Sequence, residues 1–217
     1  MRRIHLLILV LVATAGITFA DIAGTVWQGV PDAGDASDSA NRSATLANAQ
    51  FTSAGINYDS TVTGYTTGLF LNSPTFTSPQ NGFDATATAN NIEVELTGTI
   101  FLTAGDNNFD IAHDDGLTLT VNAGGSTIDG STGNVLVVND PGPTAPTVTP
   151  FDIVAGATGT YSFVLDYAEC CGPPAVLQWT FPSGAPVGGT PEPGSIVLLG
   201  TALLGVGGLL RRKFRQA

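Results

Sequence analysis

Short runs in which apolar and polar residues alternate, separated by turns, constrain the fold of this 217-residue chain more than any other feature. In residues 92–96, for example, Ile, Val and Leu alternate with two glutamates. Such a period of two predicts a strand with one buried face. Strands are expected at 92–102, 108–113, 117–122, 135–138, 160–167 and 175–181. Residues that favour turns separate them at 104–107, 114–116, 123–125 and 140–143. The pattern predicts an all-β fold, an antiparallel β-sandwich or barrel.

The segment before residue 91 is less regular. Residues 25–29 predict an early strand, with Trp27 as a core residue, and the polar residues 32–41 predict a loop. One short helix is expected within 39–51, where alanines recur. The composition is otherwise rich in Gly, Thr, Ser and Val, which favours strands and turns over helices.

The N-terminal residues have the pattern of a secretory signal peptide. Arg2 and Arg3 precede an apolar run at 6–12, and a small residue, Ala20, follows. We therefore expect residues 1–20 to be removed on export.

The C-terminal residues predict a membrane segment. Residues 194–210 carry no charge, and a helix of that length is about 25 Å long, near the lower limit for crossing a bilayer. The basic cluster that follows, which includes Arg211 and Arg212, would stay cytoplasmic and leave the preceding chain outside. The alternative is a buried helix of a globular domain, but the run has no polar face. Residues 182–190, rich in Pro and Gly, then form a linker after a domain at 21–181.

Between its two ends the chain is strongly acidic. Of 18 acidic residues only Glu192 lies outside residues 21–190, and of seven basic residues only Arg42 lies inside. This leaves 17 acidic residues, one basic residue and a formal charge of −16. Nucleic acid is excluded as a partner, because phosphate binding needs cations. The acidic residues either keep an exported protein soluble or, in part, bind divalent cations, which take oxygen ligands.

A pair of aspartates, Asp114 and Asp115, stands with Gly116 between two predicted strands, directly after His113. Adjacent carboxylates repel each other, so a pair at a tight turn indicates a bound cation or several backbone donors. Calcium suits an acidic exported protein, because it takes about six to eight oxygen ligands. The alternative is a simple hairpin turn.

The two cysteines are neighbours, Cys170 and Cys171. In an oxidising compartment three states compete: a disulfide between the two, two intermolecular disulfides, or metal binding by thiolates. We favour the disulfide between neighbours, because no His or Cys partner for a zinc site lies nearby in the sequence.

Catalysis has little support in the sequence. His113 is the only histidine between residues 21 and 190, and no Gly-x-Ser-x-Gly motif is present. A pair of carboxylates for glycoside hydrolysis is easily found among so many acidic residues, so it carries no weight. We therefore do not expect an enzyme.

The C-terminal segment resembles a PEP-CTERM sorting signal, which extends over residues 191–217. Pro191, Glu192 and Pro193 precede the apolar run, and Arg211 and Arg212 follow it. The resemblance implies export in a Gram-negative-type bacterium, anchoring in the inner membrane, and processing by an exosortase near the Pro-Glu-Pro triplet. It further implies a final place at the cell surface or in the extracellular matrix, with a link to extracellular polysaccharide or biofilm.

Residues 91–181 resemble a PA14 domain, most clearly in 109–122, which contains the two aspartates, and in 159–167. The resemblance implies a β-sandwich that binds carbohydrate. In family members that act as lectins, the Asp-Asp pair binds calcium, often through a cis peptide, and the calcium bridges to sugar hydroxyls. Asp114 and Asp115 match that motif directly, whereas Asn122 and Asp129 are assigned to capping the hairpin.

The loop at 169–174 corresponds to a second loop near the metal in such members, although its two cysteines and two prolines depart from the family pattern. By this resemblance Glu169 is the third predicted calcium ligand. The residues expected in the ligand-binding loops are His113, Gly116, Cys170, Cys171 and Gly172.

Three functions follow from these observations. The first is an exported carbohydrate-binding module that depends on calcium. The second is a structural or adhesive matrix protein whose sandwich has no specific sugar site. The third, a hydrolase acting on the same polysaccharides, is the least favoured.

Overall fold

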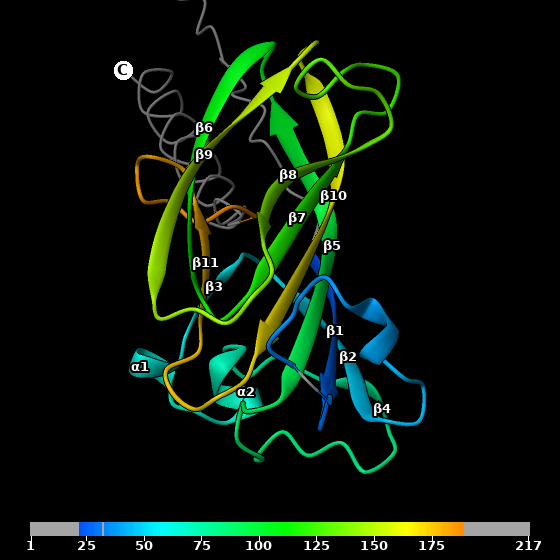
Figure 1. Ribbon diagram of the computed structural model, residues 1–217, viewed down its shortest axis with the longest axis vertical. Coiled ribbons are helices and arrows are strands. Elements are labelled where there is room, and N and C mark those ends of the chain that lie inside the picture. The colour runs from blue at the N-terminus through cyan, green and yellow to red at the C-terminus, as the bar shows by residue number, and fades with distance from the viewer. Residues whose placement is uncertain (1–21, 32, 189–217) are drawn as a thin grey trace, which may run out of the picture. The chain divides into compact units, whose positions relative to one another are not determined.

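Two antiparallel sheets face each other in the computed structural model, which describes residues 22–31 and 33–188 (Figure 1). The larger sheet has seven strands in the order β4-β2-β1-β5-β10-β7-β8. The smaller sheet has four strands in the order β3-β11-β6-β9. This β-sandwich confirms the predicted all-β class.

The chain passes from one sheet to the other several times. The larger sheet contains β1 (Ile22–Gln28), β2 (Ala47–Ser53), β4 (Thr77–Gln80), β5 (Ile92–Leu102), β7 (Leu117–Asn122), β8 (Asn134–Asp140) and β10 (Gly159–Glu169). The smaller contains β3 (Asn57–Asp59), β6 (Gly105–Asp114), β9 (Thr147–Ala155) and β11 (Val176–Thr180). The helical elements are a 3₁₀ turn (Ser39–Asn41), α1 (Ser60–Thr63) and α2 (Thr67–Phe70). Every strand predicted after residue 91 is therefore present.

The middle of the larger sheet is the pair β5 and β10. Their register places Leu96 opposite Leu165, both fully buried, and Gly98 opposite Phe163. A Cβ atom on Gly98 would lie 2.9 Å from Cζ of Phe163, so the glycine makes room for the phenylalanine ring. This cross-strand contact helps to fix the register of the pair.

Aromatic rings fill the space between the sheets. Trp179 of β11 is fully buried, and its ring centroid lies 5.1 Å from that of Phe163 and 5.7 Å from that of Phe109. Both ring pairs have edge-on geometry, which aromatic pairs prefer over a face-to-face sandwich. The two sheets are thus joined by a contact between β10 and β11.

The N-terminal third contributes three strands to the larger sheet and is more regular than expected. The early strand is confirmed as β1, but its core residue is Val26. Trp27 is only partly buried, because it points to the opposite face, where the guanidinium carbon of Arg42 lies 5.4 Å from its ring centroid. The prediction of Trp27 as a core residue was wrong. Neighbouring residues of a strand point to opposite faces, and Val26 takes the face that packs into the core.

The helix expected within 39–51 is reduced to the 3₁₀ turn Ser39–Asn41, which begins where the Asp38 side chain accepts a hydrogen bond from the Ala40 backbone N–H. Residues 47–53 form β2 instead and pair with β1 along its whole length. Pairing within the sheet overrides the helical preference of isolated alanines. The predicted helix was therefore wrong over most of its length.

Strand β9 was not predicted. It contains Pro150, which lowers the strand signal in the sequence. The strand lies at the edge of the smaller sheet and pairs with β6 alone, so a residue without an N–H is tolerated there.

The packed domain extends beyond the predicted boundary at residue 181. Val187 is fully buried, its N–H donates to the Trp179 carbonyl at 2.7 Å, and its carbonyl accepts from Ile56 N at 3.1 Å. The part of the predicted linker that the structure describes, 182–188, therefore belongs to the domain.

The predicted signal peptide (1–20) and the predicted sorting segment with its membrane helix (191–217) lie outside the described residues. Within 22–31 and 33–188, no helix has the length and apolar character needed to cross a bilayer.

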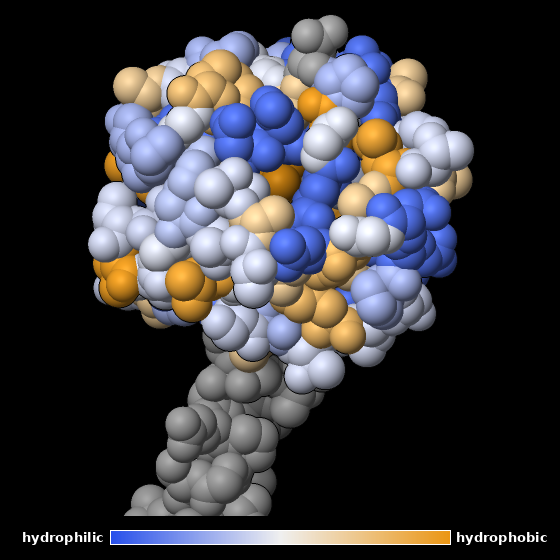
Figure 2. Space-filling model, turned by 90° about the horizontal axis from the view of Figure 1, so that it is seen from below, coloured by the Kyte–Doolittle hydropathy of each residue, from blue (hydrophilic) through white to orange (hydrophobic). Residues whose placement is uncertain are grey.

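One end of the sandwich is seen in Figure 2, where apolar side chains are scattered among polar ones. Exposed large apolar residues on the described domain include Val62, Leu69, Leu136 and Val148. Single exposed apolar residues are normal on a soluble domain surface.

Candidate functional site

The two aspartates form a corner between the sheets. Strand β6 ends at Asp114 in the smaller sheet, and β7 begins at Leu117 in the larger one. The two strands are not paired, so the alternative of a simple hairpin turn is wrong. The peptide bond between Asp114 and Asp115 is cis.

Position 116 requires glycine, because the corner leaves no space for a side chain. A Cβ atom there would lie 1.9 Å from the carbonyl oxygen of Pro141. The Gly116 carbonyl accepts a hydrogen bond from the N–H of Ala168 at 2.9 Å. Gly116 therefore brings the corner against both the 141–146 connection and the end of β10.

Three carboxylates converge beside the corner. Asp114 and Asp115 are 6% and 5% exposed, and Glu169, at the end of β10, is fully buried. One oxygen from each of the three lies within 4.8 Å of the others. The structure thus brings together the three residues predicted as metal ligands, although Glu169 is more than 50 residues away in the sequence.

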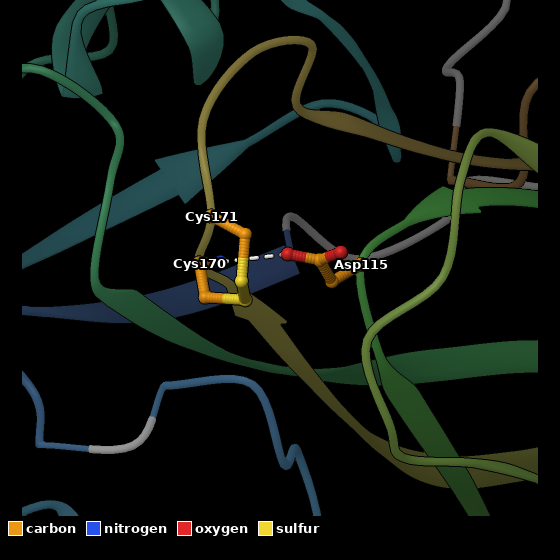
Figure 3. Close-up of side chains that lie close together, drawn as sticks. All are labelled: Asp115, Cys170 and Cys171. Carbon is orange, nitrogen blue, oxygen red and sulfur yellow. Dashed lines mark hydrogen bonds between the residues drawn. A yellow bond between two sulfur atoms is a disulfide. The ribbon is translucent and has the colours of Figure 1, made fainter.

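Backbone and tyrosine donors hold two of these carboxylates in place. Oδ1 of Asp115 accepts from the N–H of Thr144 at 3.2 Å, and Oδ2 accepts from the N–H of Cys170 at 2.8 Å (Figure 3). Glu169 accepts from the Tyr65 hydroxyl at 2.9 Å and from the Tyr167 hydroxyl at 2.8 Å. The Tyr167 hydroxyl also contacts the Asp114 carbonyl, but its single hydrogen can be donated to only one partner.

Burial and mutual repulsion disfavour the charged forms of this group. Burial, followed by the charge of Asp115, raises the pKa of Asp114 to about 6. Burial also raises the pKa of Glu169 to about 9, with the two aspartates acting in the same direction and the bonds from Tyr167 and Tyr65 opposing them. Burial next to Glu169 raises the pKa of both tyrosines. The protonated forms of Asp114 and Glu169 are therefore favoured over the charged forms.

Within the described residues, no Lys or Arg side chain pairs with this group. Arg42 is the only Lys or Arg in the described ranges, and its guanidinium pairs with Glu93 at 2.6 Å, Asp166 at 2.5 Å and Glu95 at 3.3 Å. Its charge is thus shared among three other carboxylates.

His113 supports the corner from inside the smaller sheet. Its ring is fully buried, and Nδ1 lies 2.6 Å from the carbonyl oxygen of Asp115. Since a carbonyl only accepts, Nδ1 carries the proton. Nε2 lies 3.4 Å from both Thr149 Oγ1 and Asp140 Oδ2. His113 therefore lies in strand β6, and its contacts fix the corner. A part of His113 in ligand binding stays a prediction.

The two cysteines form a disulfide with each other beside the carboxylates. Cys170 is 7% exposed and Cys171 is exposed. One oxygen of Asp115 lies within 4.8 Å of each sulfur atom, as Figure 3 illustrates. Gly172, which follows, has a φ of +108°, a conformation that favours glycine.

A pocket of about 660 Å³ is lined in part by the disulfide. Its lining comes from four separate segments, namely Ala33, Gly34, Asp35, Asn90, Asn91, Gly142, Pro143, Cys170 and Cys171. Its size falls within the range of small-molecule sites, about 300–1,000 Å³. Of the predicted loop residues, Cys170 and Cys171 line it.

Two solved structures are similar to this fold. "Crystal structure of PA14 domain of MpAFP Antifreeze protein" superimposes with a TM-score of 0.53 at 20% identity, over 76% of this chain and 84% of that one. The fold is that of a PA14 domain. "PA14 sugar-binding domain from RTX adhesin" superimposes with a TM-score of 0.50 at 16% identity, over 76% of this chain and 92% of that one.

Sequence comparison adds the C-terminal signal. Residues 190–213 match the PEP-CTERM protein-sorting motif, which confirms the predicted resemblance and indicates an exported protein that is membrane-anchored before processing. No curated protein matches the chain in sequence.

Several residues of the described domain near the corner were not predicted. Tyr65, Thr144 and Asn90 come from segments that carry no motif in the sequence, and only the fold brings them to the site. Asn122 and Asp129 were assigned to capping the hairpin. Asn122 Oδ1 accepts from Gly124 N in the turn after β7 at 2.8 Å, whereas Asp129 Oδ1 accepts from Val154 N of strand β9 at 2.9 Å.

Proposed function

We propose that this protein is an exported carbohydrate-binding module that binds sugar through a calcium ion held by Asp114, Asp115 and Glu169. The observation that carries the proposal is the convergence of three buried carboxylates with no basic side chain of the described domain to neutralise them. A buried negative charge is costly unless it is paired, so a divalent cation would stabilise the group.

The donor set fits calcium better than zinc. Three carboxylates offer hard oxygen ligands, which calcium prefers. The two sulfur atoms are joined in a disulfide and do not supply thiolates, and Nδ1 of His113 is directed at a backbone carbonyl. When bound, calcium would supply a positive centre for sugar hydroxyls. The chain's own part is to hold Asp115 and Glu169 through Cys170 N–H, Thr144 N–H and the two tyrosines.

The comparisons with known proteins support the same proposed function. One solved PA14 domain of the same fold is described as the sugar-binding domain of an adhesin. The sorting motif supports display of the domain at the cell surface or in a polysaccharide-rich extracellular matrix, with an exosortase as the processing partner. We propose no catalytic role.

Thermal unfolding of the full-length chain with calcium or with chelator tests the metal. Calcium should raise the melting temperature, because it binds the folded form. Asp114→Asn and Glu169→Gln should abolish the increase. Asp152→Asn, an exposed aspartate on β9, is the matched control and should keep it. An unchanged melting temperature of the wild type in calcium would instead favour a structural matrix protein without a metal-dependent site.

A glycan array tests the sugar. The wild type should bind a subset of glycans in calcium, and chelator should remove the binding. Binding that survives chelator, or no binding in calcium by a protein that does take up the ion, would contradict a calcium-dependent sugar site.

A further inference from the structure

The outer face of the larger sheet, which points away from the smaller sheet, carries a strip of side chains without charge. The strip consists of two neighbouring rows of residues that cross the strands. We propose that this outer strip binds an extended, neutral polysaccharide chain and does so independently of calcium. The inference goes beyond the proposed function, because it uses none of the three carboxylates and needs no metal.

The first row of the outer strip is built by the register of the sheet. Side chains alternate between the two faces of a strand, so residues that pair across strands share a face. Val164 of β10 pairs with Thr97 of β5 on one side and with Thr120 of β7 on the other. Across the six strands from β2 to β8, the row reads Thr52, Ala23, Thr97, Val164, Thr120 and Leu136. Hydroxyl-bearing and apolar side chains therefore alternate along the whole row.

The second row of the outer strip is polar throughout. It crosses four strands and contains Thr99, Ser162, Asn122 and Asn134. Nδ2 of Asn122 donates to Oδ1 of Asn134 at 2.6 Å, which holds the two amide groups in place before a ligand arrives. A prearranged binding surface lowers the cost of binding.

Two neighbouring hollows lie along the outer strip. One of about 400 Å³ is lined by residues of both rows, including Thr97, Ser162 and Thr120. The other, of about 470 Å³, is lined by residues of β1 and β2, including Ala23 and Thr52. Ala23 pairs with Thr97, so the first row leads from one hollow into the other. A ligand that fills both must cross several strands.

The lack of charge on the outer strip selects the kind of ligand. No Asp, Glu, Lys or Arg lines either hollow, although residues 21–190 contain 17 acidic residues. On β5 and β10 the charged residues of this face, Glu93, Glu95 and Asp166, are paired with Arg42 instead. An anionic polymer would find no free cation here among the described residues. A neutral polymer binds without burying an unpaired charge.

The chemistry and shape of the outer strip fit a polysaccharide chain. Thr, Ser and Asn side chains offer hydrogen bonds to sugar hydroxyls, and Val164 and Leu136, which are 36% and 51% exposed, offer apolar contacts to C–H groups. The first row is about 24 Å long, and the two rows are about 7 Å apart. Two folded domains need a contact of about 800 Å² on each partner, which so narrow a strip does not supply. A linear chain of several sugar units is therefore favoured over a second copy of this protein.

Calorimetry on the full-length chain in chelator tests the proposal with the proposed calcium site empty. The probes are neutral hexasaccharides (cellohexaose, laminarihexaose, mannohexaose, xylohexaose and maltohexaose), each with its disaccharide, and hexagalacturonate as the acidic counterpart. At least one neutral hexasaccharide should bind, with the same affinity in calcium, and its disaccharide should bind at least about tenfold more weakly. Hexagalacturonate should not bind. No binding of any neutral hexasaccharide in chelator would overturn the proposal.

Substitutions in the outer strip locate the binding. The double substitution Val164→Ala with Leu136→Ala should weaken hexasaccharide binding by about tenfold or more, because it removes the apolar contacts. Ser162→Ala should weaken it through the loss of one hydroxyl. Val148→Ala is the matched control, since Val148 is 62% exposed on β9 of the other sheet, and it should bind like the wild type. Full affinity in both strip variants would overturn the assignment.

Sedimentation of the full-length chain in detergent tests the other occupant. The wild type and the Val164→Ala, Leu136→Ala variant should have the same mass. A wild-type dimer that this variant dissociates would show that the outer strip is an interface between copies, which would overturn the proposal. The calcium-induced rise in melting temperature should be unchanged in the strip variants. Its absence from the wild type would overturn the proposed calcium site and leave the outer strip as argued.

Discussion

Tyr65 and Glu169, which are 104 residues apart in the sequence, meet through a hydrogen bond of 2.9 Å between the tyrosine hydroxyl and Oε1 of the glutamate. Tyr65 stands between the two short helices of the N-terminal third, and Glu169 ends β10. The bond therefore links the least regular part of the sequence to the proposed calcium site.

Removal of this donor should weaken calcium binding. The hydrogen bond favours the charged form of Glu169 and so opposes the rise of its pKa. In Tyr65→Phe the carboxyl should hold its proton more firmly, and calcium affinity at pH 7 should fall by about tenfold or more, as for loss of one hydrogen bond to a charged group. Calorimetry measures the affinity. The loss should shrink above pH 9, and a loss that does not depend on pH would contradict this explanation.

Calcium binding should release a proton near pH 7.5. The pKa of Glu169 is raised to about 9 and that of Asp114 to about 6, so at this pH the glutamate is mostly protonated and the aspartate mostly charged. Binding through all three carboxylates then displaces about one proton. Titration in buffers of different ionisation enthalpy counts the protons released. A heat that does not vary with the buffer would mean that Glu169 keeps its proton and is not a ligand.

The metal-free protein should gain stability as the pH falls from 9 to 5. The pKa of Glu169 in the folded state is raised above its ordinary value of 4.5, so the folded chain binds a proton that the unfolded chain releases in this range. In chelator, the melting temperature should therefore rise as the pH is lowered, and Glu169→Gln should reduce this slope. A slope of opposite sign in the wild type, or an unchanged slope in the variant, would contradict the assignment.

Gly116→Ala should destabilise the domain severely. The new Cβ atom would lie 1.9 Å from a backbone oxygen, which cannot move aside like a flexible side chain. A loss of about 3 kcal/mol or more in the free energy of unfolding is expected. Gly125→Ala is the control, because it has open space for a Cβ atom, and it should unfold within about 0.5 kcal/mol of the wild type. Chemical denaturation measures both.

Arg42→Gln should also destabilise the domain. The substitution leaves Glu93, which is fully buried, without its partner, at a cost of about 3 kcal/mol. Glu93→Gln in the same chain should recover part of the loss, because it removes the unpaired charge. Glu95→Gln should cost less than about 1 kcal/mol, since Glu95 is 39% exposed. Equal losses for Arg42→Gln with and without Glu93→Gln would show that the charge pairing is unimportant.

The sequence predicted much of the fold because the strands after residue 91 alternate with a period of two and are separated by turn residues. The sequence-based prediction failed where pairing with distant strands overrides the local preference of the residues. Ala47 and Ala49 favour a helix in isolation, but they lie in β2 and pair with β1. Pro150 weakens the sequence signal of the edge strand β9. Trp27 was assigned to the core on its size alone, although the alternation of β1 turns it outward onto Arg42.

The sequence predicted only part of the candidate site. Asp114 and Asp115 are adjacent, so their pairing is visible in the sequence, and the resemblance to PA14 domains added Glu169. Two donors that orient the carboxylates, Tyr65 and Thr144, could not be found that way, because they come from segments without a motif. Burial of His113 was equally hidden, since a histidine next to two aspartates looks like a functional group until the sheet around it is known.

A crystal structure of the full-length chain grown in calcium tests the central claim most directly. One cation is predicted, bound by carboxylate oxygens of Asp114, Asp115 and Glu169 at about 2.3–2.6 Å. Soaking with a disaccharide should then place sugar hydroxyls on the same ion. A structure in calcium in which these three carboxyl groups hold no ion, and in which Glu169 bonds only to Tyr65 and Tyr167, would contradict the account.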